Sequence, residues 1–238
     1  MSDKKRILVI SAHAVDFVWR AGGTIAQYAQ NGHQVKIIDL TFGQRGESQS
    51  VWKQTPGISE EEVMEIRKKE ATATAETLGA EIVFYSWKDH LLMFDRQMME
   101  RLSADIMDFQ PDIVLTHSAS DPLNEDHTNT YHAVLSALRG ANVSGVFPEK
   151  KPTKQVEIYT FEPDEPDVSK FEPDIYIDIT DVFDTKLSAM EKVASQKFMV
   201  ADYTVRSQYR GALAKRFVPG VKYAEAFQRV TPLVAKEF

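Results

Sequence analysis

Short apolar runs alternate with amphipathic stretches along most of the chain. Runs rich in β-branched residues, too short for helices, predict buried strands at residues 6–11, 35–41, 82–85, 112–117, 156–161 and 175–179. Helical patterns lie between them, at residues 16–31, 59–78, 96–109 and 127–138. Strands that alternate with helices indicate a mostly parallel sheet with helices on both faces. We therefore expect one Rossmann-like α/β domain, doubly wound, over residues 1–238.

The remaining segments are less regular. Residues 43–57 and 118–126 form polar loops, 161–173 form a loop rich in Pro and acidic residues, and 180–238 are expected to be mostly helical. In a doubly wound sheet, ligands bind beyond the carboxyl ends of the strands, where the first and fourth strands lie side by side. The loops that leave these two strands contain His13, Asp16 and His127.

Composition narrows the possible chemistry. The 238 residues include no Cys, which excludes disulfides, thiolate zinc sites, iron–sulfur clusters and a Cys nucleophile. With 28 basic against 35 acidic side chains, the net charge of −7 argues against nucleic-acid binding, although a local group of cations could bind a small anionic substrate. The sequence contains no apolar stretch long enough for secretion or for a membrane span, so we expect a cytoplasmic protein without a membrane partner.

His13, Asp16 and His127 are candidate metal ligands. His13 and Asp16 lie three residues apart after the first strand, and His127 lies at the expected start of a helix, where the dipole disfavours a charged imidazole. Two neutral imidazoles and one carboxylate suit Zn²⁺, and also Fe²⁺ or Co²⁺. In the alternative interpretation, Asp16 only caps its helix and His13 packs locally. No Gly-x-Gly-x-x-Gly follows the first strand, and no Gly-x-Ser-x-Gly elbow is present.

Residues 11–25, SAHAVDFVWRAGGTI, resemble the opening motif of the LmbE/PIG-L family of zinc-dependent N-acetylglucosamine deacetylases. Further similarity lies in residues 41–47, in 67–71 with 78–79, in 114–117 with Asp126 and His127, and in 195–196 with 223–227, where the family has C-terminal helices. The resemblance implies that His13, Asp16 and His127 hold the metal. It also implies a homo-oligomer.

Two positions depart from the deacetylase pattern. The family's general base is an aspartate at the position of Val15, and a histidine that stabilises the oxyanion stands at the position of Asn124. Val15 cannot accept a proton, and general-base assistance is typically worth about 10²–10⁴-fold. The chain is most similar to a branch of the family that lacks this aspartate and hydrates 4-oxalomesaconate (4-carboxy-2-hydroxymuconate) in gallate and protocatechuate breakdown.

The resemblance to this branch implies roles for several residues. Glu47 is expected to position and deprotonate the attacking water. Asp164, where the branch has a histidine, could donate a proton if burial raised its pKa. Carboxylate clamps are expected at Arg20, Arg45 and Arg67, and Asn124 is a further substrate contact. Apart from this resemblance, His117 is expected to support the site or the fold, His132 to be structural, and His33 and His90 to be ordinary loop residues.

Three functions remain open at this stage. The first is a metal-dependent hydro-lyase acting on a small unsaturated oxo-polycarboxylate. The second is a zinc-dependent deacetylase in which Glu47 replaces the missing base. The third is a metal-bound binding protein without catalysis. Val15 and Asn124 argue against the second, and the ligand trio with Glu47 argues against the third.

Overall fold

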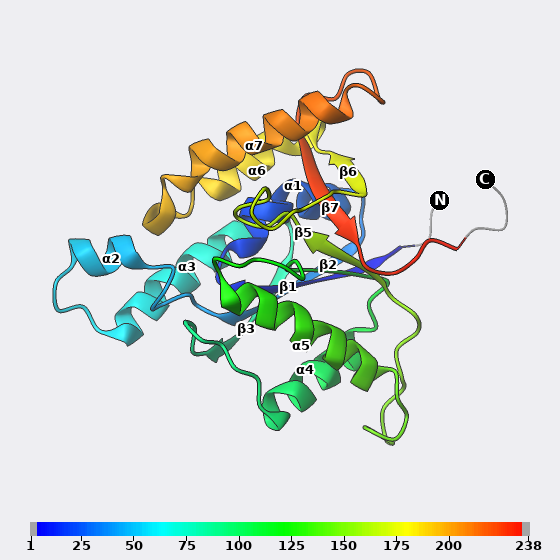
Figure 1. The fold of residues 1–238 in the computed structure, drawn as a ribbon. Helices are drawn as coiled ribbons and strands as arrows, with labels where there is room; N and C mark the ends of the chain where they lie inside the picture. The colour runs from blue at the N-terminus through cyan, green and yellow to red at the C-terminus, as the bar shows by residue number, and fades with distance from the viewer. Residues whose placement is uncertain (1–3, 235–238) are drawn as a thin grey trace.

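One mixed sheet forms the centre of the computed structural model, which describes residues 4–234 (Figure 1). The strands lie in the order β3-β2-β1-β4-β5-β7-β6, and all neighbours from β3 to β5 are parallel. The bounds are β1 (Arg6–His13), β2 (Gln34–Thr41), β3 (Glu81–Trp87), β4 (Ile113–Thr116), β5 (Glu157–Phe161), β6 (Ile175–Asp178) and β7 (Ala224–Arg229). The predicted α/β class and the 3-2-1-4 order are confirmed.

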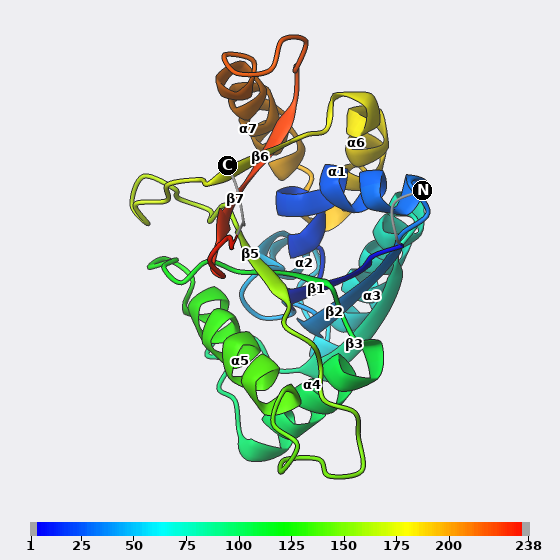
Figure 2. The same cartoon turned by 90° about the vertical axis from the view of Figure 1, so that its right-hand side faces the viewer.

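Helices cover both faces of this sheet (Figures 1 and 2). On one face lie α1 (Asp16–Gln30), α3 (Glu60–Leu78), α6 (Phe183–Met190) and α7 (Met199–Ala214), and on the other lie α4 (Arg96–Phe109) and α5 (Glu125–Ala141). Each face has its own apolar core, one built around Phe17, Ile37 and Phe161 and the other around Leu8, Ile38 and Leu102. Alternate residues of the central strands therefore point into different cores.

Local sequence signals account for several helix ends. Ser59 and Glu62 form the expected capping box at the start of α3, in which each side chain binds the other residue's backbone N–H. The same helix ends at Gly79, which is left-handed with φ 76°. Asp95 caps α4 by accepting a hydrogen bond from the N–H of Met98.

The C-terminal region, expected to be mostly helical, also contains a strand. Residues 223–227, expected from the resemblance to be helical, lie largely in β7, which pairs antiparallel with both β5 and β6. Tertiary pairing overrides the helix propensity of Ala224–Arg229, and buried Glu225 accepts hydrogen bonds from Gly23, Thr24 and Lys186. A Cβ on Gly211 of α7 would lie 2.2 Å from the carbonyl oxygen of Lys222, so a glycine is required for α7 to approach the start of this strand.

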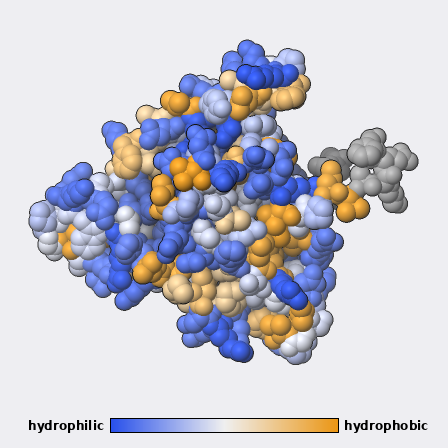
Figure 3. All heavy atoms as spheres, viewed as in Figure 1, coloured by the Kyte–Doolittle hydropathy of each residue, from blue (hydrophilic) through white to orange (hydrophobic). Residues whose placement is uncertain are grey.

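A second difference lies in the loop after β2, which contains a short helix, α2 (Gln49–Gln54). Two 3₁₀ turns, Thr180–Val182 and Ala194–Gln196, complete the elements. Hydrophilic residues cover most of the face seen in Figure 3, with apolar residues in small groups. Within residues 4–234, no helix has the length and apolar character needed to cross a bilayer.

Candidate metal centre and catalytic cavity

The turn between β1 and α1 brings two candidate ligands to one side. His13 is the last residue of β1 and Asp16 is the first of α1, and the N–H of His13 donates to Asp16 Oδ2 over 2.9 Å. Between them, Val15 has a left-handed backbone with φ 72°, which is unusual for a β-branched residue. Such a conformation costs on the order of 1–3 kcal/mol and persists where the surrounding structure imposes it.

His127, in the first turn of α5, joins this pair. Asp16 Oδ2 lies 3.2 Å from His13 Nδ1 and 3.4 Å from His127 Nε2. One ligand atom from each residue lies within 4.8 Å of the other two. His13 Nδ1 and His127 Nε2 are both buried, and neither makes a hydrogen bond. Two imidazole nitrogens without partners, converging on one carboxylate oxygen, are the donor set that a divalent cation requires.

The other nitrogen of each ring is bound to a carboxylate. His13 Nε2 lies 3.2 Å from Asp126 Oδ2, and His127 Nδ1 lies 2.9 Å from Asp121 Oδ2. A carboxylate that accepts the N–H of an imidazole fixes its tautomer, so the lone pair of the opposite nitrogen is free to ligate a metal. The arrangement therefore fits a metal and not only a pair of packed histidines.

The electrostatics of the group favour positive charge. Burial lowers the pKa of His13, but the nearby carboxylates of Asp126 and Asp16 outweigh it, and the pKa lies well above its ordinary value. The pKa of His127 is also raised, because Asp16 and Asp121 outweigh burial. The carboxylates around these rings therefore stabilise a cation at this position.

His117 lies beside the group but is not free to ligate. Its Nε2 accepts the N–H of Ala12 over 2.9 Å, and its ring stacks on His127 with centroids 4.0 Å apart. Burial, together with the charge of His127, lowers the pKa of His117 to about 3, so the ring is neutral. These contacts agree with the expected supporting role.

Arg20 and Asp164 form an ion pair beside Asp16. The Arg20 guanidinium donates to Asp16 Oδ1 over 2.8 Å and to Asp164 Oδ1 over 2.5 Å, and Tyr203 also donates to Asp164. Burial raises the pKa of Asp164, but the charges of Arg20 and His127 outweigh it and the pKa is lowered. The raised pKa that a proton-donating Asp164 needs is therefore absent. Arg20, an expected substrate clamp, has a buried guanidinium that pairs with these two carboxylates.

A cavity of about 500 Å³ opens next to the metal group. Glu47, half-buried, lines it and accepts hydrogen bonds of 3.2 Å from Asn124 and from Gln196. Glu47 Oε1 lies 3.9 Å from His13 Nδ1, so this carboxylate faces the position of the cation. The remaining lining residues are Arg45, Gly46, Gln49, His90, Leu91, Leu123, Glu125 and Asp126.

Comparison with known proteins agrees with this geometry. The model of the family described as PIG-L, GlcNAc-PI de-N-acetylase, matches residues 8–138. The 4-oxalmesaconate hydratase of Pseudomonas putida is 38% identical over 238 residues, which cover 98% of this chain and 92% of the relative. The chain belongs to the PIG-L family.

A solved structure of a hydratase is also similar to this PIG-L protein. The crystal structure of GalB, the 4-carboxy-2-hydroxymuconate hydratase from Pseudomonas putida KT2440, superimposes with a TM-score of 0.95 and 38% identity, covering 98% of this chain and 99% of that one. The N,N'-diacetylchitobiose deacetylase from Pyrococcus horikoshii matches with a TM-score of 0.80 at 23% identity, covering 98% and 88%. The similarity to the deacetylase shows only that the two proteins share a fold.

The two remaining arginines of this PIG-L site differ in their access to the cavity. Arg67 is fully buried, and its guanidinium donates to the carbonyl oxygens of Phe42 and Ala14 and to the side chains of Glu70 and Ser195. In the structure, the donors of Arg67, an expected carboxylate clamp, are bound by the protein itself.

Arg45 remains available to a substrate. Its side chain is 41% exposed, it lines the cavity, and it pairs with Glu60 over 3.0 Å. Among the three predicted arginine clamps, Arg45 alone keeps access to the cavity.

Several contributions were not predicted from the sequence. Asp121 was not singled out, and Asp126 was noted only as part of the family motif, yet both orient the ligand histidines. Gln196 binds Glu47 from a distant part of the chain. Signals for the two aspartates existed, because both lie within six residues before His127 in the second polar loop. Gln196 belonged to a segment noted for its resemblance to the family, but nothing in the pattern indicated that its amide would reach Glu47.

Proposed function

We propose that this protein is a metal-dependent hydratase that adds water to a small unsaturated oxo-polycarboxylate such as 4-oxalomesaconate. The observation that carries the proposal is the full-length similarity to the hydratase of Pseudomonas putida, in sequence and in structure. Val15 supports it further, since an apolar side chain stands where the family's deacetylases have their base.

His13, Asp16 and His127 are proposed to hold the cation, with Zn²⁺ preferred and Fe²⁺ or Co²⁺ as alternatives. When bound, a divalent cation supplies Lewis acidity, which lowers the pKa of a coordinated water and polarises an oxo acid. Asp121 and Asp126 hold the two imidazoles in the ligating tautomer. Arg20 offsets the charge of Asp16 and Asp164 behind the ligands.

Glu47 is proposed as the base. Its carboxylate takes one proton from the attacking water, whose oxygen forms a bond to one carbon of the C=C double bond. The π electrons move toward the oxo acid, and a proton then adds to the neighbouring carbon. Glu47 returns its proton to solvent, so the net change is the addition of one water. Asn124 and Gln196, which donate to Glu47, keep its two oxygens oriented for this transfer.

Arg45 and Asn124 are the proposed substrate contacts. Both line the cavity, and the exposed Arg45 guanidinium presents a fork of donors suited to a carboxylate. An anionic substrate competes with Glu60 for this fork, because the pair is at the surface and weakly held.

We also propose that the chain acts as a single domain. A cytoplasmic location and homo-oligomeric assembly stay predictions.

The test supplies the metal-loaded protein with 4-carboxy-2-hydroxymuconate and, separately, with N-acetylated amino sugars. The proposal expects loss of the ultraviolet absorbance of the conjugated acid and no release of acetate. Acetate release without hydration would favour the deacetylase instead. No reaction with either substrate, at confirmed metal occupancy, would favour a binding protein.

A further inference from the structure

The segment that follows β3 contributes a histidine to the cavity. His90 and Leu91 both line the cavity, and both have left-handed backbones, with φ 61° and φ 75°. Two successive non-glycine residues in this conformation are rarely found unless the surrounding structure imposes it. Strained backbone of this kind is concentrated at functional sites and persists only where surrounding contacts hold it.

One carboxylate holds the strained backbone. Asp126 accepts three successive N–H groups, from His90 over 2.7 Å, Leu91 over 3.0 Å and Leu92 over 2.7 Å. The same Asp126 Oδ2 that binds the N–H of His90 also lies 3.2 Å from His13 Nε2. The backbone of His90 is therefore fixed next to the metal group through a single shared oxygen.

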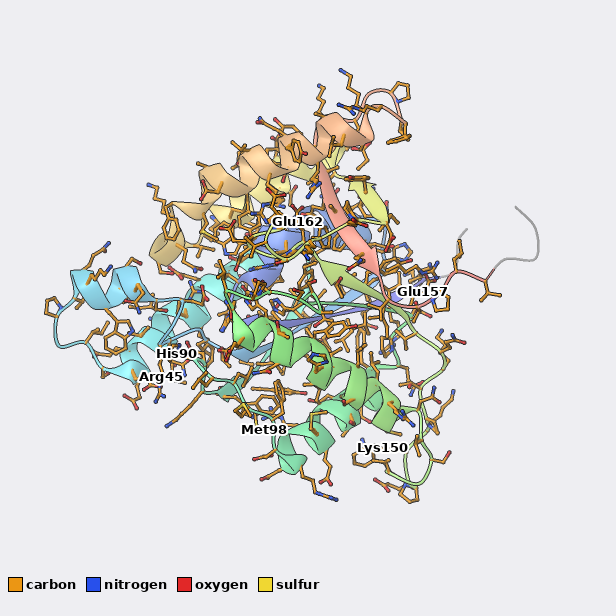
Figure 4. All side chains as sticks on the ribbon, viewed as in Figure 1. Arg45, His90, Met98, Lys150, Glu157 and Glu162 are labelled. Carbon is orange, nitrogen blue, oxygen red and sulfur yellow. The ribbon has the colours of Figure 1, made fainter. Side chains whose placement is uncertain are left out.

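A second carboxylate joins this segment to the loop of Glu47. Buried Asp89 accepts the N–H groups of Arg45 and Gly46. In Figure 4, Arg45 and His90 lie close together at one end of the sheet, far from Glu157 and Lys150 at the other end, and both line the same cavity. The backbone of His90 is thus held between the loop of Glu47 and the metal group, and its side chain lines their shared cavity.

His90 differs from the other five histidines of the chain. His13 and His127 belong to the buried metal group, and His117 accepts the N–H of Ala12 beside it. The ring of His33 accepts the N–H of Lys5, and His132 packs beside Tyr131. Only His90 combines an exposed side chain with a place in the cavity wall. Imidazole can give or take a proton near neutral pH, and solvent can return the proton it loses.

The proposed hydration requires an acid, and the sequence candidate does not supply one. Asp164 is ion-paired with Arg20 and is not part of the cavity lining. We propose that His90 is the catalytic acid of the hydration, a role that rests on the proposed function. Its imidazolium gives a proton to the carbon next to the one that gains oxygen, which neutralises the carbanion character left when the C=C bond breaks. Solvent then protonates His90 again, and Glu47 releases the proton it took.

The charged groups around His90 are compatible with this role. Asp126 faces its backbone, Glu47 and Glu125 line the same cavity from the loop after β2 and from α5, and Arg45 lies beside it. Carboxylates from α5 and from the loop after β2 therefore share this cavity with His90.

The test compares His90→Asn with His132→Asn. Asparagine tolerates the left-handed backbone, so the variant removes the proton donor while keeping the loop geometry. We expect hydration by His90→Asn to fall by about 100-fold or more in kcat. Metal content and Tm should stay those of the unsubstituted protein. The fall of kcat/KM at alkaline pH that the unsubstituted protein shows should be absent in His90→Asn. Added imidazole should restore part of the variant's rate. His132→Asn should behave as the unsubstituted protein.

The outcomes separate this role from the proposed function. If His90→Asn hydrates the conjugated acid as fast as the unsubstituted protein, His90 is not the catalytic acid, while the proposed function stands. A slower variant that keeps the alkaline limb and shows no imidazole rescue would also reject it, because a purely structural defect behaves in that way. If the unsubstituted, metal-loaded protein does not hydrate the conjugated acid, the proposed function fails and the role of His90 fails with it.

Discussion

The two walls of the site are built in opposite ways. On the metal side, His13 is 2% exposed and His127 is 1% exposed, and both rings are fixed by carboxylates. On the cavity side, the side chains of Glu47 and Arg45 are 29% and 41% exposed. A cation needs a dry, rigid set of donors, whereas a substrate that enters and leaves needs side chains in reach of solvent. The same fold provides both, because one wall starts from the central strands and the other from loops.

The largest effect is expected on the metal wall. In His127→Ala, one of the two nitrogens that converge on Asp16 is lost, so the site should lose its metal and all hydration activity. Elemental analysis of the purified variant checks the first effect and an ultraviolet assay checks the second. His132→Ala, five residues further along α5 and exposed, is the matched control. Full metal occupancy in His127→Ala would contradict the ligand assignment.

Glu47→Gln tests the cavity side of the site. The amide keeps the size of the side chain but cannot take a proton, so we expect turnover to fall by about 10²–10⁴-fold. Metal content should not change, because Glu47 is not one of the three ligands. Glu65→Gln, on the exposed surface of α3, serves as control. A near-normal rate in Glu47→Gln would remove the carboxylate from its role as base.

Arg67→Met tests the structural support behind the site. The substitution leaves Glu70, which also holds Ser195, without its buried cation. Loss of one partner of a buried pair typically lowers the free energy of unfolding by about 3–5 kcal/mol. Denaturant unfolding should show this loss, whereas Arg45→Met should change stability little, because that pair is at the surface. Equal stability of the two variants would show that burial does not distinguish these arginines.

The smallest effect concerns Asp126 and pH. Burial raises its pKa, but the hydrogen bonds from His13 and the backbone lower it more, to about 2. In the unfolded chain, Asp126 has its ordinary pKa of 3.8, so the unfolded state binds the proton at a higher pH than the folded state does. The contribution of Asp126 to stability is therefore complete above about pH 4 and is lost as the pH falls to about 2. In the metal-free protein, Asp126→Asn should lower the free energy of unfolding at pH 7 by about 2 kcal/mol.

The measurement compares denaturant unfolding of Asp126→Asn at pH 7 and at pH 3. The deficit should shrink at the lower pH, where the carboxylate of the unsubstituted protein has begun to lose its advantage. Glu125→Gln, at the adjacent exposed position, should show no such change with pH. A deficit that is constant with pH would mean that packing, and not charge, explains the loss.

Periodicity and topology predicted the parts of this protein that depend on local or repeating signals. Alternating strands and helices predicted the order of the first four strands. That order in turn predicted that His13, Asp16 and His127 lie together at one edge of the sheet. The strand at residues 224–229 could not be predicted from its helix-favouring residues, because its conformation depends on pairing with β5 and β6. Arg67 and Arg45 are the same residue type, and only burial and partners show which one faces the cavity.

The order of the last three strands has a consequence for how the chain folds. β7 lies between β5 and β6 in the sheet, yet it follows both along the chain. During synthesis, β6 has no neighbouring strand until residues 224–229 have emerged, so this edge of the sheet closes last, through contacts of long sequence separation. Before residues 224–229 emerge, the nascent chain has an unpaired sheet edge that can bind other polypeptides, so we expect that interval to be the one most exposed to aggregation.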